Sequence, residues 1–367
     1  MLMSREKIGQ LFMVGFEGTA VTPDLADFIK EYKPGGVILF ARNLESIEQI
    51  VDLTNDLQRC SPHSPLLISI DQEGGRVSRL PKPFTIFPPG DVLGRCNSSE
   101  LAYAAAATIA KELRAVGINM NMAPVLDVNS NPANPVIGDR AFGTTPGPVC
   151  ELGLATAGGL QDNRVVACGK HFPGHGDTAT DSHKELPVVE APREQLEQIE
   201  FPSFRRATTH GVATMMTAHV LYKALDDQQP ATLSPAIITR LLREEMRYDG
   251  VVLTDDLEMR AIIDHYGIEE ATVRALLAGC DMPLICKDRN REIAAITALD
   301  KAVADGTVTS QRLDVSLARV ARLKQQFLVP YKPAVLSDAK LIVGCRSHQL
   351  LLRTIHQARE RVARVAG

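Results

Sequence analysis

The chain has 367 residues, a formal net charge of −4, and 45% hydrophobic and 23% charged residues. This length suits either two ordinary domains or one large barrel, and the composition is that of a globular protein, which excludes a disordered or collagen-like chain. The slight negative charge argues against nucleic acid or an anionic membrane surface as a partner.

Eight short apolar segments recur along the chain and are predicted to be β-strands. They cover residues 11–16, 36–40, 66–70, 119–125, 165–168, 212–216, 250–254 and 281–286. Helical segments separate them, for example 101–115 after a capping box and 235–247 after the N-cap Ser234. Eight strand–helix alternations predict a TIM-like (β/α)8 barrel. An open, doubly wound sheet is the alternative, because periodicity does not establish closure.

The helical segments 290–304 and 310–327 can complete the outer ring of the predicted barrel, and Pro330 and Pro333 then mark a break. We therefore predict a catalytic barrel over residues 1–329 and a helical extension over 330–367. The last helix is basic and amphipathic, and we expect it to pack on the barrel. A contact in a dimer is the alternative, so the protein is expected to be a monomer or a weak homodimer.

The N-terminus lacks the basic start and apolar core of a signal peptide, and no apolar run approaches the roughly 20 residues of a membrane span. The seven cysteines are scattered and odd in number, as a reducing compartment tolerates. These features predict a soluble cytoplasmic protein with no membrane partner. The absence of tryptophan disfavours an extended stacking platform for long polysaccharides.

Charged residues lie in the segments that follow the predicted strands, at the place where barrel enzymes build their active sites. They include Asp71, Arg79, Asp127, Arg140, Lys170, His171, His219, Asp255 and Asp256. Basic side chains beside carboxylates suit a polyhydroxylated small molecule or a phosphate, and a structural ion-pair network is the alternative. No Walker or Rossmann fingerprint occurs, which argues against a nucleotide enzyme. Of Asp255 and Asp256, one can face the pocket while the other caps the following helix.

The predicted loop over 171–186 is long enough to be functional. Asp181 and His183 form a carboxylate–imidazole pair suited to acid–base catalysis, because the carboxylate fixes the tautomer and the other ring nitrogen exchanges a proton. A surface turn is the alternative. His171 and His175 have the spacing of a helical metal site, but the Phe-Pro-Gly between them prevents a helix, and we expect no metal.

Four blocks of this sequence resemble glycoside hydrolase family 3, and more narrowly its β-N-acetylglucosaminidase branch. The most specific block is Lys-His-Phe-Pro-Gly-His-Gly-Asp-Thr over 170–178, continued by Asp-Ser-His over 181–183. The segments 70–77, 121–127 and 253–257 are similar to the other blocks of the family and stand in the same order. The resemblance spans roughly residues 5–327.

This resemblance implies a retaining two-step mechanism without a cofactor. It makes Asp255 the nucleophile with Asp256 as its neighbour, and His183 the general acid and then base, oriented by Asp181. It assigns the binding of sugar hydroxyls to Asp71, Arg79, Arg140, Lys170 and His171. The implied activity is that of an exo-β-N-acetylhexosaminidase acting on terminal N-acetylglucosamine of small glycosides, such as cell-wall muropeptide sugars in peptidoglycan recycling.

Several alternatives stay open. A neutral histidine base does not repel an anion, so phosphate can replace water in the second step, which would make the enzyme a phosphorolytic N-acetylglucosaminidase or β-glucosidase of the same family. The second alternative is a metal-dependent barrel hydrolase using His171, His175 and a carboxylate. The third is a non-catalytic sugar-binding barrel. Glu258 departs from the family pattern, in which a small residue commonly stands at that position.

Overall fold

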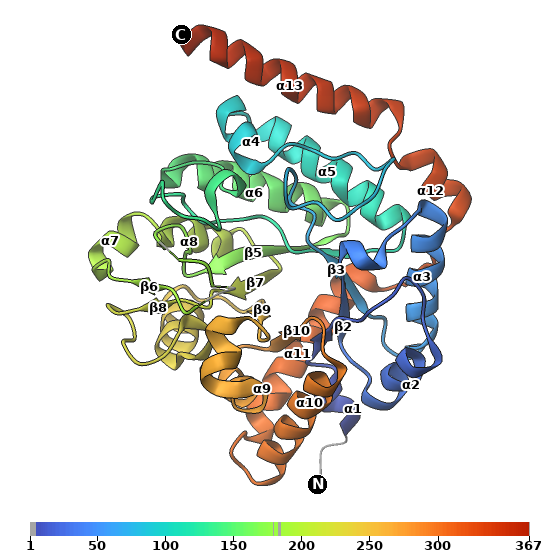
Figure 1. Ribbon diagram of the computed structural model, residues 1–367, viewed down its shortest axis with the longest axis vertical. Coiled ribbons are helices and arrows are strands. Elements are labelled where there is room, and N and C mark those ends of the chain that lie inside the picture. The colour runs from blue at the N-terminus through green and yellow to red at the C-terminus, as the bar shows by residue number, and fades with distance from the viewer. Residues whose placement is uncertain (1–4, 179, 183–184, 367) are drawn as a thin grey trace.

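The computed structural model describes residues 5–178, 180–182 and 185–366. Eight parallel strands close a barrel in the order β1-β10-β9-β7-β5-β4-β3-β2, and helices surround it (Figure 1). The (β/α)8 prediction is confirmed, and the open sheet is excluded. The strands are β1 (Met13–Val14), β2 (Gly36–Leu39), β3 (Leu67–Ile70), β4 (Met120–Asn121), β5 (Val166–Phe172), β7 (Thr214–Thr217), β9 (Val251–Asp256) and β10 (Met282–Ile285).

The predicted strand segments overlap all eight barrel strands, but the ends of β5 and β9 differ in a way that matters for the site. β5 continues to Phe172 and β9 to Asp256, so Lys170, His171 and Asp255 belong to strands that point at the barrel mouth. β4 is shorter than predicted and is followed by Pro124, which has no N–H to donate to a strand ladder. The nearly continuous burial of all barrel strands explains why their sequences are apolar on both faces.

Helices cover the outside of the barrel because each has one apolar face to bury. The predicted segments 101–115, 290–304 and 310–327 correspond to α5, α10 and α11, and 235–247 corresponds to the π-helix η4. The helices of the ring and its loops are α1 (Arg5–Gly9), α2 (Pro23–Tyr32), α3 (Ile47–Arg59), α4 (Gly90–Cys96), α5 (Ser99–Ala115), α6 (Pro146–Asp162), α7 (Arg193–Gln198), α8 (Phe201–Thr209), η4 (Ala236–Glu245), α9 (Arg260–Ala278), α10 (Arg289–Ala304) and α11 (Ser310–Leu328). Short 3₁₀ turns are η1 (Ala41–Asn43), η2 (Gly138–Arg140) and η3 (Ala231–Leu233).

A two-stranded parallel sheet lies outside the barrel and is not among the predicted elements. It pairs β6 (Val188–Val189) with β8 (Leu221–Tyr222). Strands of two residues carry no periodicity that a sequence pattern can detect. The sheet joins the segment after the β5 loop to the segment after β7, and it places Tyr222 in the interior beneath that loop.

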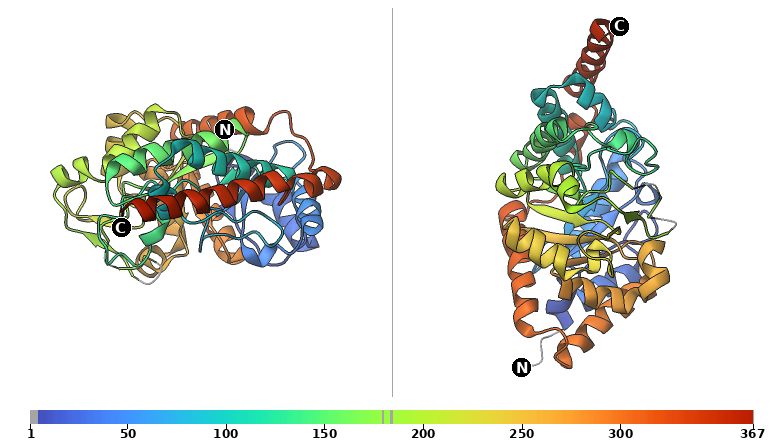
Figure 2. Two further views of the ribbon diagram at one scale, coloured as in Figure 1. Left: turned by 90° about the horizontal axis from the view of Figure 1, so that it is seen from above. Right: turned by 90° about the vertical axis from the view of Figure 1, so that its left-hand side faces the viewer.

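The C-terminal part forms α12 (Leu336–Ile342) and α13 (Arg346–Ala366). α13 runs along α4 and α5, and its C-terminal end stands out from the body of the protein (Figures 1 and 2). The buried Glu112 of α5 fixes its start, because one carboxylate oxygen accepts from the N–H of Gly344 at 2.9 Å and lies 2.7 Å from Nδ1 of His348. The domain boundary at residue 330 stays a prediction.

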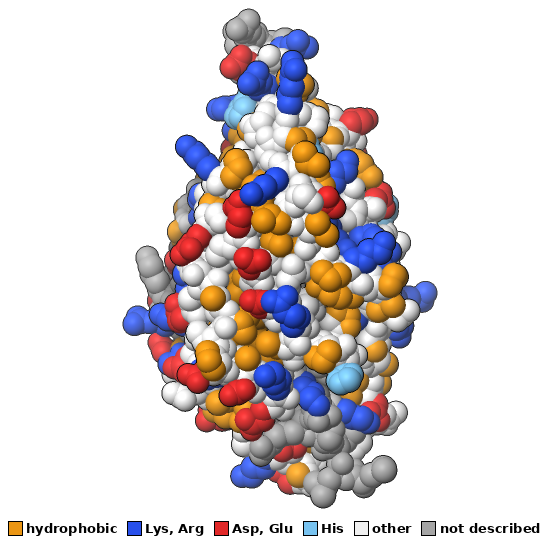
Figure 3. All heavy atoms as spheres, turned by 90° about the vertical axis from the view of Figure 1, so that its right-hand side faces the viewer, with side chains coloured by type: hydrophobic (Ala, Val, Ile, Leu, Met, Phe, Trp, Pro, Cys, Tyr) orange, Lys and Arg blue, Asp and Glu red, His pale blue; other side chains and the backbone are white. Residues whose placement is uncertain are grey.

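Acidic and basic side chains are interspersed on the face formed near α2, α3 and α12, so neither sign of charge dominates it (Figure 3). In the part of the chain that the structure describes, no helix is both long and apolar enough to cross a membrane. All seven cysteines are free thiols.

Candidate active site

A cavity of about 380 Å³ opens at the carboxyl ends of the barrel strands. Seven of the eight predicted site residues line it: Asp71, Arg79, Arg140, Lys170, His171, Asp181 and Asp255. The eighth, His183, lies outside the described residues. The parallel direction of the strands explains why residues so far apart in sequence meet, since the carboxyl ends of all eight strands face one side.

Lys170 is the centre of a buried charge network on one wall of the cavity. Its Nζ atom lies 2.7 Å from Oδ1 of Asp71 and 2.7 Å from Oε1 of Glu73. Both carboxylate oxygens of Glu73 in turn accept from Arg140, at 2.9 and 2.8 Å. The ion-pair network, which was the alternative interpretation, is therefore present, and the binding of a ligand by the same residues stays a prediction. Glu73 is not among the predicted site residues, although it lies within the 70–77 block.

The network holds Glu73 and Lys170 in their charged forms. Burial alone would raise the pKa of Glu73, but the charges of Arg140 and Lys170 outweigh it and lower that pKa strongly. Burial alone would lower the pKa of Lys170, but Asp71 and Glu73 outweigh it and raise that pKa. The wall thus presents fixed charges to a polar ligand.

Asp127 is fully buried and orients His171 from behind. Its Oδ2 atom lies 2.6 Å from Nδ1 of His171, and its Oδ1 atom accepts from the backbone N–H groups of His171 and His175 at 3.1 and 2.7 Å. Burial works against ionisation, but the two histidines outweigh it, so the pKa of Asp127 is lowered. The Nε2 atom of His171 is left facing the cavity side, 3.5 Å from Arg140. In the sequence, only its position after the fourth strand distinguishes Asp127.

His175 lines the cavity, but both of its ring nitrogens are engaged by the protein. Nδ1 lies 2.9 Å from Oγ1 of Thr178, and Nε2 lies 3.3 Å from Oγ of Ser182. Burial and the charge of His171 lower the pKa of His175 to about 4, so it is neutral and structural. Among the described residues, no group of three or more histidine, cysteine or acidic side chains is placed to hold a metal ion. The expectation of no metal stays a prediction.

The neighbouring acids Asp255 and Asp256 have opposite pKa shifts. Burial works against ionisation of Asp255, but His219, His171, the N–H of Asp256 and Lys170 together lower its pKa. Burial raises the pKa of Asp256 to about 7, and the charges of Glu258 and Asp255 add to this. Asp256 also has the structural role, since its Oδ1 accepts from the N–H of Glu258 at 3.0 Å and its carbonyl accepts from Nε2 of His219 at 2.9 Å. Asp255 is therefore the ionised carboxylate at the strand end.

Glu258, the residue that departs from the family pattern, ties two strand ends together. Its carboxylate accepts from the backbone N–H groups of Cys286, Lys287 and Asp288 at 3.0, 2.7 and 3.2 Å. It thereby joins the end of β9 to the loop after β10. No sequence pattern signals this contact, because the partner N–H groups lie about thirty positions further along the chain.

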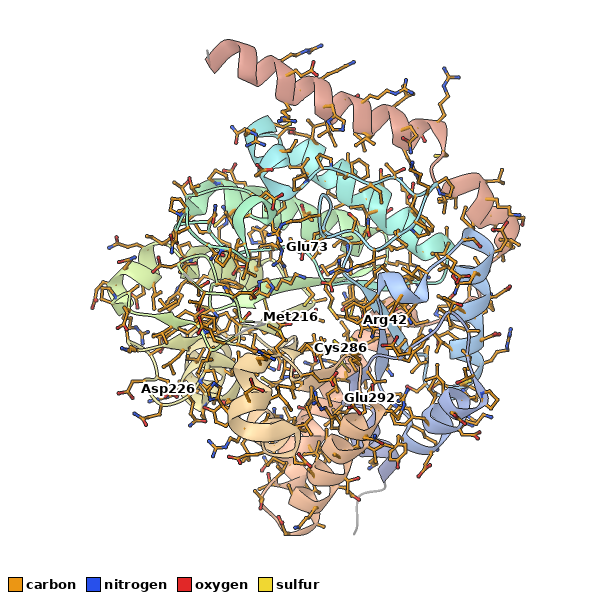
Figure 4. The ribbon with its side chains drawn as sticks, viewed as in Figure 1. Arg42, Glu73, Met216, Asp226, Cys286 and Glu292 are labelled. Atoms are coloured by element: carbon orange, nitrogen blue, oxygen red, sulfur yellow. The ribbon has the colours of Figure 1, made fainter. Side chains whose placement is uncertain are left out.

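Apolar side chains line the cavity together with the charged ones. Glu73 on the charged side lies across the barrel centre from Met216 of β7 and Cys286 after β10 (Figure 4). The apolar lining residues are Ile38, Phe40, Val77, Pro135, Val136, Met216, Met259 and Leu284. A small ligand with many hydroxyls and one apolar substituent matches such a mixed lining.

The β5 loop reaches back over this cavity. The carbonyl of Ser182 accepts from the N–H of Ala261 at 3.3 Å, which places the loop against the start of α9. Asp181 and Asp255 consequently line one cavity from two different elements. The predicted partner of Asp181, His183, is two positions further along the chain and lies outside the described residues.

A closed (β/α)8 barrel whose strand ends surround a cavity of paired charges and an ionised carboxylate is the architecture of a barrel enzyme acting on small polar molecules. The family model described as glycosyl hydrolase family 3 N terminal domain matches residues 3–341. The chain belongs to glycosyl hydrolase family 3.

Three relatives show which branch it resembles. The β-hexosaminidase A of Pseudoalteromonas piscicida is 38% identical over 361 residues, which cover 91% of this chain and 60% of that protein. The structure of a β-N-acetylglucosaminidase from Paenibacillus sp. str. FPU-7 has a TM-score of 0.94 and 45% identity, and the match covers 98% of this chain and 69% of that one. NagZ from Neisseria gonorrhoeae, in complex with N-trifluoroacetyl-D-glucosamine, has a TM-score of 0.77 and 30% identity, with 95% and 98% covered.

The first of these relatives is a longer protein, and this chain spans 60% of its length. The match to NagZ covers almost the whole of both chains. The relatives are β-N-acetylhexosaminidases, that is, glycoside hydrolases, and the predicted family and branch are confirmed at that level.

Proposed function

We propose that the protein is a retaining exo-β-N-acetylglucosaminidase that removes terminal N-acetylglucosamine from small glycosides, such as muropeptide sugars, in the cytoplasm. The observation that carries the proposal is the position of Asp255. It is an ionised carboxylate at a strand end, in the same cavity as Asp181 and the Lys170 network. The named activities of the relatives supply the sugar class.

In the first step, the Asp255 carboxylate attacks the anomeric carbon of the terminal sugar. A bond from carbon to the Asp255 oxygen forms, the glycosidic bond breaks, and His183 gives its proton to the departing oxygen. Asp181 orients the imidazole and favours its charged form. The low pKa of Asp255 keeps it unprotonated as the nucleophile.

In the second step, the now neutral His183 takes a proton from water, and the resulting hydroxide attacks the anomeric carbon and releases Asp255. Two inversions give overall retention. Asp71, Arg140, Lys170, His171 and Arg79 would hold the sugar hydroxyls, since they line the cavity with fixed hydrogen-bonding groups. We propose no cofactor and no metal for either step.

An assay on an aryl N-acetylglucosaminide, run with and without phosphate, tests this proposal. Release of free N-acetylglucosamine in both buffers supports it. Formation of the sugar 1-phosphate would instead make the enzyme a phosphorylase. Turnover that disappears on exhaustive chelation would favour the metal-dependent alternative, and the absence of turnover would leave a sugar-binding barrel.

A further inference from the structure

Glu200 is a buried carboxyl group that has no role in the proposed mechanism. It precedes α8, its side chain is 2% exposed, and Oε1 accepts from Oγ of Ser130 at 3.1 Å. The second oxygen, Oε2, is buried without a hydrogen-bond partner among the described residues. A buried ionised carboxylate normally has a cation or several donors around it, so a carboxyl group in this setting is held in its uncharged form.

The Glu200 carboxyl group lies directly against the backbone of the β5 loop at Gly174. A Cβ atom at Gly174 would lie 2.5 Å from Oε2 and 2.7 Å from Cβ of Glu200, so only glycine allows this approach. The carbonyl of Gly174 accepts from the hydroxyl of the buried Tyr222 at 2.5 Å. Gly174 is therefore held between a side chain of β8 and the Glu200 carboxyl group.

A continuous series of contacts runs from this point to the cavity. The residue after Gly174 is His175, whose N–H donates to Asp127 and whose ring contacts Ser182 at 3.3 Å. The carbonyl of Ser182 accepts a hydrogen bond from Ala261 at the start of α9. Ser182 follows Asp181, which lines the cavity. A displacement at Gly174 would be passed to Asp181 through these contacts.

Among the described residues, the groups that face Glu200 come from three segments, and none of them is a cation. They are Asp127 and Ser130 after β4, Gly174 and Asp177 in the β5 loop, and Tyr222 of β8. Burial, together with the charges of Asp127 and Asp177, raises the pKa of Glu200 to about 8. Ionisation above that pH would put a third negative charge beside two existing ones.

We propose that Glu200 is a positioning residue that, in its uncharged form, supports the base of the β5 loop and so keeps Asp181 at the cavity. When Glu200 loses its proton at alkaline pH, repulsion from Asp127 and Asp177 loosens the contact at Gly174. The effect on the reaction rests on the proposed function, because it acts through Asp181. The effect on the loop does not depend on the proposed function.

Hydrogen exchange of the 171–178 segment tests the loop directly. After correction for the intrinsic pH dependence of exchange, the wild type should lose about tenfold in protection between pH 7 and pH 9, since a group with a pKa near 8 goes from mostly protonated to mostly ionised over this interval. Glu200→Gln keeps the shape of the side chain without the ionisation, and its protection should be the same at both pH values.

Glu292→Gln is the matched control. Glu292 of α10 is also fully buried, burial raises its pKa to about 8, and it lies away from the β5 loop on the other side of Cys286 from Glu73 (Figure 4). This variant should keep the wild-type pH response. Wild-type protection that is equal at pH 7 and pH 9 would overturn the proposal, even if neither variant folds. A Glu200→Gln variant whose protection falls with pH as the wild type's does would also overturn it.

The pH profile of kcat/KM on an alkyl N-acetylglucosaminide separates this inference from the proposed function. Wild-type activity that falls above pH 8, and falls less in Glu200→Gln, supports both. A wild type without turnover contradicts the proposed function alone, because the exchange measurement still decides the role of Glu200.

Discussion

The Oε1 atom of Glu73 lies 2.7 Å from the Nζ atom of Lys170, with both side chains almost fully buried. The same oxygen accepts from Arg140 at 2.8 Å, so one carboxylate separates two buried cations. Glu73 thereby links two basic residues that line the cavity.

Replacing Glu73 by Gln should destabilise the protein by about 3–5 kcal/mol, because Arg140 loses its carboxylate partner and Lys170 keeps only Asp71. Differential scanning calorimetry measures the loss. In the folded fraction, KM should rise more than kcat falls, since Lys170 and Arg140 are proposed to bind the sugar rather than to react. Asp139→Asn removes an exposed acid paired with Arg76 and serves as the control. Equal stability of the two variants would contradict this account of Glu73.

Asp255→Ala should lower kcat by about 10⁴-fold or more, as removal of a catalytic nucleophile does. Asp256→Asn should cost far less, because the pKa of Asp256 near 7 already leaves it partly protonated and its oxygen can still accept from Glu258. A 2-fluoro sugar that traps the intermediate should label Asp255, as read by peptide mass spectrometry. A label on Asp256 would reverse the assignment.

His183→Ala should slow substrates with poor leaving groups by about 10²–10⁴-fold, because their departing oxygen needs a proton. Activated aryl glycosides should be affected much less in the first step. Comparing kcat/KM for a nitrophenyl and an alkyl N-acetylglucosaminide measures the difference. Equal losses on both substrates would contradict the role of His183 as the acid.

Lys324 of α11 predicts a pH dependence of stability. Its ammonium group is buried and donates to two neutral groups, Gln10 at 2.9 Å and Ser64 at 3.1 Å, and burial lowers its pKa from 10.5 to about 7. Between these values the unfolded chain binds the proton more strongly than the folded protein does, so this residue makes stability rise with pH from about 7 to 10.

Lys324→Met should therefore raise Tm more at pH 6.5 than at pH 9.5, because the methionine fills similar space without a buried charge. Thermal unfolding of the variant and the wild type at both pH values gives the comparison. The exposed Lys301 offers a control substitution, Lys301→Met, with no such pH difference. A change in Tm that is the same at both pH values would mean that Lys324 is not neutralised by folding.

The barrel could be predicted because its strands are buried on both faces, and such strands are mostly apolar. Most cavity residues could be predicted because they follow the carboxyl ends of parallel strands, which meet on one side of the barrel. Asp181 reaches the cavity from the β5 loop. The ion pairs within the cavity could not be predicted from the sequence. Glu73 and Asp71 are both acids after the same strand, and only the fold shows that Glu73 is the one that contacts both Lys170 and Arg140.

The contacts of Glu258 and Glu200 could not be predicted from the sequence either. Glu258 accepts hydrogen bonds from backbone N–H groups. Because nearly every residue has such a group, the residue types at these positions do not indicate the contact. Glu200 lies against a glycine, and glycines are common in loops wherever a tight turn needs a positive φ, so this one does not stand out. Long-range contacts of this kind follow from packing rather than from local periodicity.

The charges of Asp71, Lys170, Glu73 and Arg140 cancel within one buried cluster. Such a cluster projects little field into the surrounding water, and dissolved salt cannot enter between its members to screen them. An uncharged sugar would then reach the cavity by diffusion alone, without electrostatic steering. The association rate constant of the sugar should therefore be nearly independent of ionic strength. In its binding kinetics the cavity would resemble an uncharged site, although many charged side chains surround it.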